Sequence, residues 1–305
     1  MSSLEDLSKF LAVKEVHYHE CVDVVTQNFV LNNLKGNVRY HHMRFDGNGL
    51  PMVKALAEVL YDYIIDYCIS ARNRSAPLTT VQSARLVKEA RALFRRPEVT
   101  AEDPDETGEA GEALLFFLTE AILKAPQIVA KMELKTNHRD EVKGSDGIHA
   151  RWDPTSNIVD FYFGESKLYK DVNSAISAVI KSVNGFHDNE MYRHELVMVT
   201  KHFKYADEKV RERISDLIKR GEPGAGARLN HACLIGYDWA KYKSLDSADL
   251  KNDFLAHLVE DSQKIIKNLD KKFESFEKLH LRFEFFFIPF PSVAEFRNAF
   301  NAALK

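Results

Sequence analysis

Residues Lys143 to Lys167 read KGSDGIHARWDPTSNIVDFYFGESK, and this stretch decides the fold. Its segment 158–163 is β-branched or aromatic at every position except Asp160, which is typical of a strand. The segment DPTSN at 153–157 contains the residue types that form turns. The stretch therefore predicts two paired antiparallel strands joined by a turn.

Three ionisable residues stand at one end of this predicted hairpin. Asp146 is placed where the first strand begins, and Glu165 and Lys167 are placed where the second strand ends. In an antiparallel pair those two places meet at the same end of the sheet. Side chains alternate between the faces of a strand, so Glu165 and Lys167 share one face and Ser166 lies on the other. We therefore expect two carboxylates and one ammonium group to converge.

This set of side chains fits a hard divalent cation. Mg²⁺ prefers oxygen ligands, is often held by one or two carboxylates, and keeps positions for water and phosphate oxygens. Asp146 and Glu165 would be ligands, with the carbonyl of Ser166, while Lys167 would orient a water molecule or neutralise charge on phosphorus. The alternative is that Glu-x-Lys is a solvated strand face and that Asp-Gly is only a turn.

Asp146 followed by the FGESK segment at 163–167 resembles the signature of the PD-(D/E)xK nuclease superfamily. The resemblance implies a restriction-endonuclease-like α/β core, in which a helix, a three-stranded meander, a second helix and a further strand follow one another. It also implies hydrolysis of phosphodiester bonds in DNA with Mg²⁺ or Mn²⁺ as the cofactor. The Pro-Asp of the superfamily name is absent, since Ser145 precedes Asp146.

The elements around the hairpin follow the same order. A helix is predicted from Gly111, a strand at 128–135 and a helix at 168–183. Many superfamily members carry a glutamate near the start of the first helix, and Glu112 is the matching position. The dipole of a helix also favours an acid in its first turn, which is the structural explanation for Glu112.

Four segments together resemble the HamA family, the nuclease effectors of the two-gene Hachiman anti-phage system. They are DGIH at 146–149, FGESK at 163–167, HACLIGYD at 231–238 and FFIPFPSVAEF at 286–296. The resemblance implies a defence role and a partner, a superfamily 2 type helicase like HamB. It also implies that the nuclease is restrained in the assembled complex until DNA is sensed.

Composition excludes several other classes of protein. The 305 residues are 45% hydrophobic and can bury a substantial core, while a net charge of −3 gives no global basic field. Any contact with DNA must therefore come from local patches or from a partner. Cys21, Cys68 and Cys233 are widely spaced, which argues against a disulfide framework or a zinc finger. The N-terminus lacks the features of a signal peptide, and the apolar helix predicted at 51–71 carries charges, so we expect a cytoplasmic protein without a membrane span.

A basic helix is predicted from Thr79 to Phe94, and it could follow a DNA backbone. Its cations lie on one side of the helix or at its end and are Arg85, Lys88, Arg91 and Arg95. A track of phosphate contacts is the functional interpretation, and a solvated helix face is the alternative.

Other candidates for substrate contact flank the hairpin. Lys131 and Lys143 could line a groove, because a phosphodiester that approaches two carboxylates needs compensating positive charge. His149 could contact the nucleic acid or assist proton transfer, or it could simply be packed in the sheet. His17 and His19 would share a face if residues 1–50 were short strands, which raises the alternative of a metal site there.

Taken together, the sequence predicts an α/β chain with three parts. These are an N-terminal α/β region with the basic helix at 1–104, a nuclease core at 105–205, and a C-terminal α/β region at 206–305 that completes the sheet and offers a partner surface. The expected activity is that of a metal-dependent deoxyribonuclease. Two alternatives stay open: a catalytically idle subunit that regulates a helicase, and a restriction endonuclease that reads a specific sequence.

Overall fold

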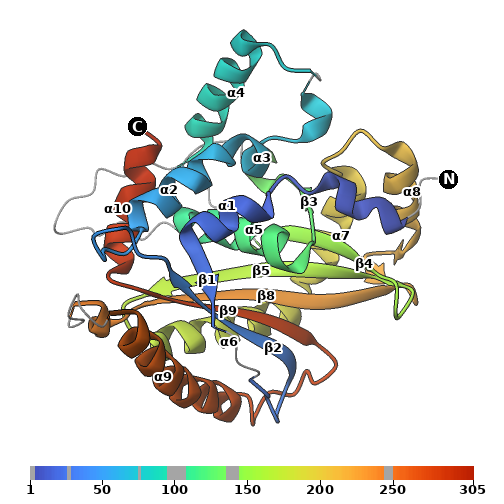
Figure 1. Cartoon of the computed structure of the whole chain (residues 1–305). Coiled ribbons are helices and arrows are strands. Elements are labelled where there is room, and N and C mark those ends of the chain that lie inside the picture. The colour runs from blue at the N-terminus through green and yellow to red at the C-terminus, as the bar shows by residue number, and fades with distance from the viewer. Residues whose placement is uncertain (1–3, 26–28, 75–76, 95–107, 135–143, 244–249) are drawn as a thin grey trace.

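The computed structural model describes residues 4–25, 29–74, 77–94, 108–134, 144–243 and 250–305. Seven strands form one mixed sheet, in the order β1-β2-β9-β8-β5-β4-β3 (Figure 1). Their bounds are β1 Val22–Val24, β2 Lys35–Met43, β3 Gln127–Val129, β4 Ile148–Asp153, β5 Ile158–Tyr169, β8 Ala227–Asp238 and β9 Arg282–Phe290. A separate small hairpin consists of β6 Ile218–Lys219 and β7 Glu222–Pro223.

The predicted hairpin is confirmed as strands β4 and β5. The two strands are antiparallel, with Ile148 opposite Phe163 and Asp153 opposite Ile158. Strand β3 adds to β4 in the antiparallel sense, while β5, β8, β9 and β2 are parallel neighbours. The fold is therefore mixed α/β, as the sequence predicted. The one sheet draws its strands from all three ranges 1–104, 105–205 and 206–305.

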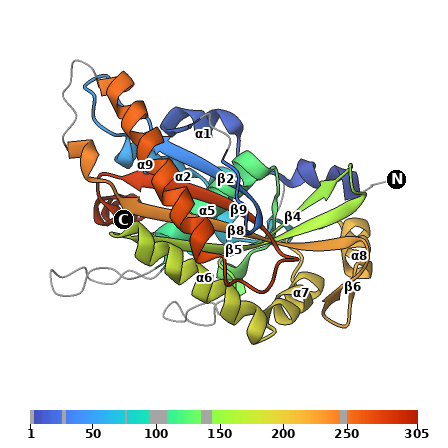
Figure 2. The same cartoon turned by 90° about the horizontal axis from the view of Figure 1, so that it is seen from below.

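Helices cover both faces of the sheet (Figures 1 and 2). On one face lie α1 Glu15–Cys21, α2 Val53–Asp62, α3 Ile64–Cys68, α5 Glu109–Leu123 and α10 Val293–Ala303. On the other face lie α6 Val172–Asp188 and α9 Leu250–Lys272. Helices α7 Met191–Lys201 and α8 Glu208–Asp216 pack on β3, β4 and β5 together with the 3-10 segment Leu4–Phe10. Helix α4 Thr80–Leu93 projects away from these layers.

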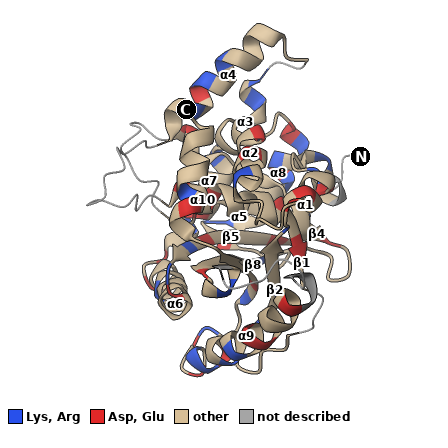
Figure 3. Ribbon diagram, turned by 60° about the vertical axis from the view of Figure 1, so that its left-hand side comes forward, with Lys and Arg blue, Asp and Glu red and all other residues tan. Residues whose placement is uncertain are grey.

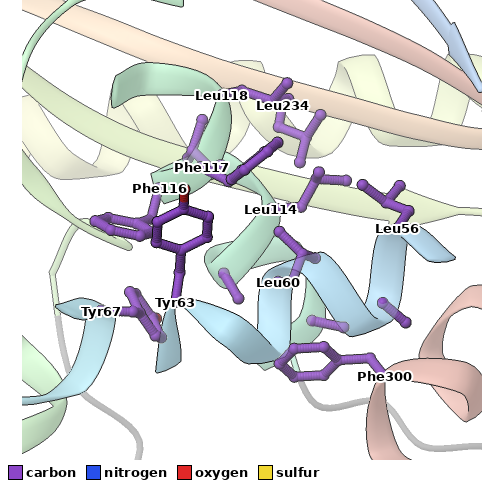
Figure 4. Close-up of a cluster of buried hydrophobic side chains, with 14 of the residues drawn as sticks. Leu56, Leu60, Tyr63, Tyr67, Leu114, Phe116, Phe117, Leu118, Leu234 and Phe300 are labelled. Atoms are coloured by element: carbon purple, nitrogen blue, oxygen red, sulfur yellow. The ribbon is translucent and has the colours of Figure 1, made fainter. Parts of the chain in front are cut away.

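Helix α5 is the central helix of the first face. It has 15 residues, of which only Glu112 and Ile122 are not fully buried. Its sequence EAGEALLFFLTEAIL is apolar around most of the helix, and such a helix is stable only when it is enclosed. Figure 4 shows Leu56 and Leu60 of α2, Phe300 of α10 and side chains of α5 in one cluster. This packing fixes the start of α5 relative to β5.

One predicted strand is wrong and another is shorter than predicted. Residues 15–21 form helix α1, because Tyr18 and Cys21, three positions apart, are both buried on one side of it. The strand predicted at 128–135 ends at Val129, and Lys131–Leu134 is a 3-10 turn. Among the described helices, none combines the length and the apolar composition that crossing a membrane requires.

Candidate active site

Asp146 lies at the open edge of β5, just before β4 begins. Its backbone N–H donates to the carbonyl of Gly164 over 2.8 Å, so the chain is already aligned with β5 at this point. Ser166 is the next residue of β5 whose N–H faces this edge, and β4 has no residue opposite it. The Asp146 Oδ2 atom takes that place and accepts hydrogen bonds from the Ser166 N–H at 2.5 Å and from Oγ at 2.7 Å. The end of the hairpin thus determines where the carboxylate lies.

The electrostatic setting of Asp146 comes mainly from burial. Burial raises the pKa of Asp146, while the Lys167 ammonium and the hydrogen bonds from Ser166 act in the opposite direction. Gly111 lets α5 approach this edge, because a Cβ atom there would lie 3.0 Å from Ser166 Oγ and 3.1 Å from Leu168 Cγ. The close approach of α5 explains why Asp146 is half-buried although it lies at a strand end.

Glu165 and Lys167 share the face of β5 that carries α6, and Ser166 points toward α5, as alternation predicted. Lys167 Nζ lies 2.5 Å from Glu165 Oε1, and the two side chains are 25% and 10% exposed. Burial and the nearby Asp146 carboxylate raise the pKa of Glu165 to about 7, although Lys167 and a hydrogen bond with Ser182 oppose the shift. Burial disfavours the charge of Lys167, but Glu165 outweighs this and raises the pKa of the ammonium. The ammonium therefore stays charged beside a carboxylate that titrates near neutrality.

Glu112 approaches Asp146 from the first turn of α5. The Tyr67 hydroxyl donates to Glu112 Oε2 over 3.0 Å. A cavity of about 10 Å³ separates Glu112 from Asp146, which is room for about one water molecule. The residues that line it are Tyr67, Glu112, Gln127, Lys131, Met132, Ser145 and Asp146. The structure therefore brings Glu112 to the same small space as Asp146.

A buried ion pair holds the residue that precedes Asp146. Lys131 Nζ lies 2.8 Å from Glu195 Oε1 and also donates to the carbonyl of Ser145. The same Glu195 atom accepts from the Ser145 N–H at 3.1 Å, so both backbone polar groups of Ser145 are bound by the pair. Gly144 has φ +101°, and a Cβ there would lie 1.8 Å from Glu195 Oε1. Only glycine fits this position, and the backbone before Asp146 is held rigidly.

The donor chemistry of the site fits a divalent cation that prefers oxygen. Asp146 and Glu165 supply carboxylates, and the Asp146 Oδ1 atom has no hydrogen-bond partner among the described residues. Burial raises the pKa of both acids, and the Asp146 carboxylate further raises the pKa of Glu165, so a nearby positive charge would be favoured. Within the described ranges no group of three or more His, Cys, Asp or Glu residues is placed to hold a metal ion. The histidines of α1 therefore form no such group either. A cation here would rest on the two carboxylates, a backbone carbonyl and water, as Mg²⁺ sites commonly do.

The residues predicted to contact nucleic acid have different surroundings. Arg85 and Lys88 are exposed on α4. Figure 3 shows basic positions along this helix in blue. Arg91 is half-buried and donates from Nε to the Leu304 carbonyl over 2.6 Å and also to the Lys305 carbonyl. Arg95 and Lys143 lie outside the described residues.

The structure decides between the alternatives for two residues beside the predicted substrate groove. His149 is 2% exposed, and its Nδ1 donates to the Ala125 carbonyl over 2.9 Å. Burial lowers its pKa to about 3, so it is a neutral, packed histidine that cannot reach a nucleic acid. Lys131 is 4% exposed and is committed to the ion pair described above. His149 is therefore the packed histidine of the alternative interpretation, and Lys131 lines only the small cavity beside Asp146.

The sequence did not indicate Tyr67, Gln127 or Glu195 as parts of this site. Tyr67 belongs to the apolar stripe of a helix, where it is indistinguishable from a core residue. Glu195 stands 64 positions from its partner Lys131. The one sequence signal for Glu195 is its place in an otherwise apolar helix turn, beside Leu196 and Val199.

Comparison with known proteins gives one finding. A search of curated proteins produces no match. The family model described as HamA matches residues 17–304, which is nearly the whole chain and includes every residue of the site above. The chain therefore belongs to the HamA family, a family associated with Hachiman anti-phage defence.

Proposed function

We propose that this chain is a metal-dependent DNA nuclease with a PD-(D/E)xK core, the effector that works with a helicase subunit in the cytoplasm. The observation that carries the proposal is the Asp146 carboxylate bound to the Ser166 N–H, on the strand that also presents Glu165 and Lys167. Membership of the HamA family supports the defence role. The element order α5, β3, β4, β5, α6 supports the core at 105–205, and β8 from the range 206–305 supplies the further strand.

Each side chain has a chemical task in this proposal. Asp146 and Glu165, with the Ser166 carbonyl, would hold Mg²⁺ or Mn²⁺, which when bound polarises a phosphodiester and favours ionisation of water. Ser166 pre-orients Asp146, because its N–H and Oγ both bind the same carboxylate oxygen. Lys167 keeps its charge and stabilises negative charge that develops on phosphorus. Glu112 supports the site from the opposite side of the small cavity.

DNA would reach this site with help from outside it. The net charge of −3 gives no general attraction, so we assign the exposed Arg85 and Lys88 of α4 to contacts with the phosphate backbone. A helicase that delivers DNA would supply the remaining affinity. This assignment predicts that charge loss on α4 weakens DNA binding and leaves the chemistry of a bound strand intact.

Plasmid digestion in Mg²⁺ or Mn²⁺ tests the proposal, with the wild type compared with Glu165→Ala and Lys167→Ala. Loss of a carboxylate ligand or of the companion cation is expected to abolish cleavage. Glu260→Ala and Lys264→Ala are matched controls, because this pair on α9 also lies close, at 2.7 Å, but is 60% and 66% exposed. Equal DNA loss in all five proteins would refute the assignment of chemistry to this site.

The ion pair between Glu165 and Lys167 also favours a second candidate, an idle subunit that regulates the helicase. A carboxylate already neutralised by an ammonium group can be purely structural. In that case neither substitution changes DNA cleavage by the assembled complex. Sequencing of the cut ends addresses the other alternative, because discrete ends indicate a sequence-specific restriction enzyme and scattered ends indicate a nuclease that follows a helicase.

A further inference from the structure

Gln127 enters the candidate active site from the start of β3, and its position is fixed at several points. It is 1% exposed and lies opposite His149 in the sheet. Its backbone N–H donates to Glu120 Oε1 over 2.9 Å. Its side-chain Oε1 accepts from Lys204 Nζ over 2.8 Å. Backbone and side chain are therefore both held by buried charged groups.

Lys204 determines which way the Gln127 amide points. An ammonium group has only donors, so the amide atom that faces it must be the oxygen, and Nε2 must face elsewhere. Lys204 is 1% exposed, and it also donates to the carbonyl of Asp66, which leaves it little freedom to turn. Gln127 lines the cavity of about 10 Å³ between Glu112 and Asp146, whereas Lys204 does not. The N–H₂ group is thus the end of the amide left for the cavity.

The N–H₂ donor of Gln127 faces a cavity that is lined by hydrogen-bond acceptors. Nε2 donates no hydrogen bond to any residue in the described part of the chain, so this donor is available to the cavity that Gln127 lines. Glu112 and Asp146 are acceptors when ionised, and the space holds about one water molecule. Such a water can accept from Nε2 and give its two protons to the carboxylates. Its second lone pair then remains for a cation.

We propose that Gln127 is a positioning residue, which orients a water molecule at Asp146 through Nε2 while Lys204 fixes the direction of this donor. The inference rests on the proposed nuclease function, because the water would complete the oxygen ligands around the cation held at Asp146. Loss of a group that orients the ligands of a metal commonly lowers affinity or activity by about 10–100-fold.

Gln127→Glu separates this role from a structural one. The glutamate keeps the size of the side chain and an acceptor for Lys204, but it replaces the N–H₂ donor by a carboxylate oxygen. A residue that only satisfies Lys204 would tolerate this change. We expect the rate constant of plasmid cleavage at saturating Mg²⁺ to fall about 10–100-fold, with the metal-free melting temperature preserved. Gln263→Glu, an exposed change of the same kind on α9, is the control.

Gln127→Met provides a second variant and a readout that needs no cleavage. It removes the donor without adding charge, and with it the oxygen that accepts from Lys204. The Mn²⁺ concentration at the midpoint of the thermal shift is expected to rise about 10-fold relative to the wild type. Wild-type cleavage by Gln127→Glu, or an unchanged Mn²⁺ midpoint in Gln127→Met, would overturn the role of Gln127. If the nuclease assignment itself is wrong, the wild type and Glu165→Ala will cleave DNA equally. In that event the Mn²⁺ midpoint of Gln127→Met still tests the role of Gln127.

Discussion

Replacement of Lys131 by methionine is expected to lower the free energy of unfolding by about 3–5 kcal/mol, because it leaves a buried carboxylate without its cation. The side chains of Lys131 and Glu195 are 5% and 1% exposed, so water cannot replace the lost ammonium. Glu195 Oε2 already has no hydrogen-bond partner among the described residues. Methionine has nearly the length of the lysine stem, so the loss arises from charge and not from a cavity.

Adding Glu195→Gln to this variant should recover part of the stability. The glutamine is neutral, and its amide oxygen can still accept from the Ser145 N–H as Glu195 does. The Ser145 carbonyl remains without the lysine donor, and one unsatisfied buried group costs about 1–3 kcal/mol. We therefore expect the double variant to be about 2 kcal/mol more stable than Lys131→Met alone.

Equilibrium unfolding in urea measures these differences, with the fluorescence of Trp152 and Trp239 and with far-ultraviolet circular dichroism as probes. Lys264→Met is the control, since its partner Glu260 is exposed and such a pair contributes at most about 1 kcal/mol. A cost below about 1 kcal/mol for Lys131→Met, or purely additive costs in the double variant, would refute the view that a buried ion pair holds Ser145.

Three further outcomes follow from the same geometry. Gly144→Ala should destabilise the protein by more than about 2 kcal/mol, because its φ of +101° and the contact with Glu195 both exclude a Cβ; an unchanged melting temperature would contradict this. The pKa of Glu165 is raised to about 7 in the folded state, so the folded protein binds a proton more tightly than the unfolded chain, and the stability of the metal-free protein should fall as pH rises from about 4.5 to 7. Glu165→Gln should flatten that profile in calorimetry, and Mg²⁺ should stabilise the wild type most above pH 7; the same slope in both proteins would refute the assignment. Thr79→Ala removes the capping box with Gln82 and should lower the local stability of α4 by about 1 kcal/mol, measured by faster amide hydrogen exchange there and not in α5.

The sequence predicted the elements that depend on close neighbours. The hairpin 148–169 follows from its turn residues and from the β-branched and aromatic run. The helix predicted at 168–183 is α6, but it begins at Val172, because β5 continues to Tyr169 and the side chain of Asp171 accepts a hydrogen bond from the Ser174 N–H. Alternation along β5 likewise predicts that Glu165 and Lys167 share one face, as the structure shows.

The sequence could not predict the direction in which isolated polar residues point. His149 and Lys131 stand beside the site in the chain, and either could face a substrate or the core. Helix α5 and Leu196 of α7 pack against strands β3, β4 and β5, and this packing turns His149 and Lys131 inward. The pairing of β5 with β8 and β9 in one parallel set also depends on which faces the helices cover.

By itself, then, the sequence determined the hairpin, the pairing of Glu165 with Lys167 and the position of Asp146 at the strand end, because each depends on interactions between residues that are adjacent in the chain or across one turn. Tertiary structure alone decided that Lys131 meets Glu195 and that Lys204 meets Gln127, since these partners are 64 and 77 positions apart. A contact over such a distance is fixed by how helices and sheet pack, and burial then decides which charges must pair. The local sequence places Asp146, Glu165 and Lys167, and the packed interior holds them in place.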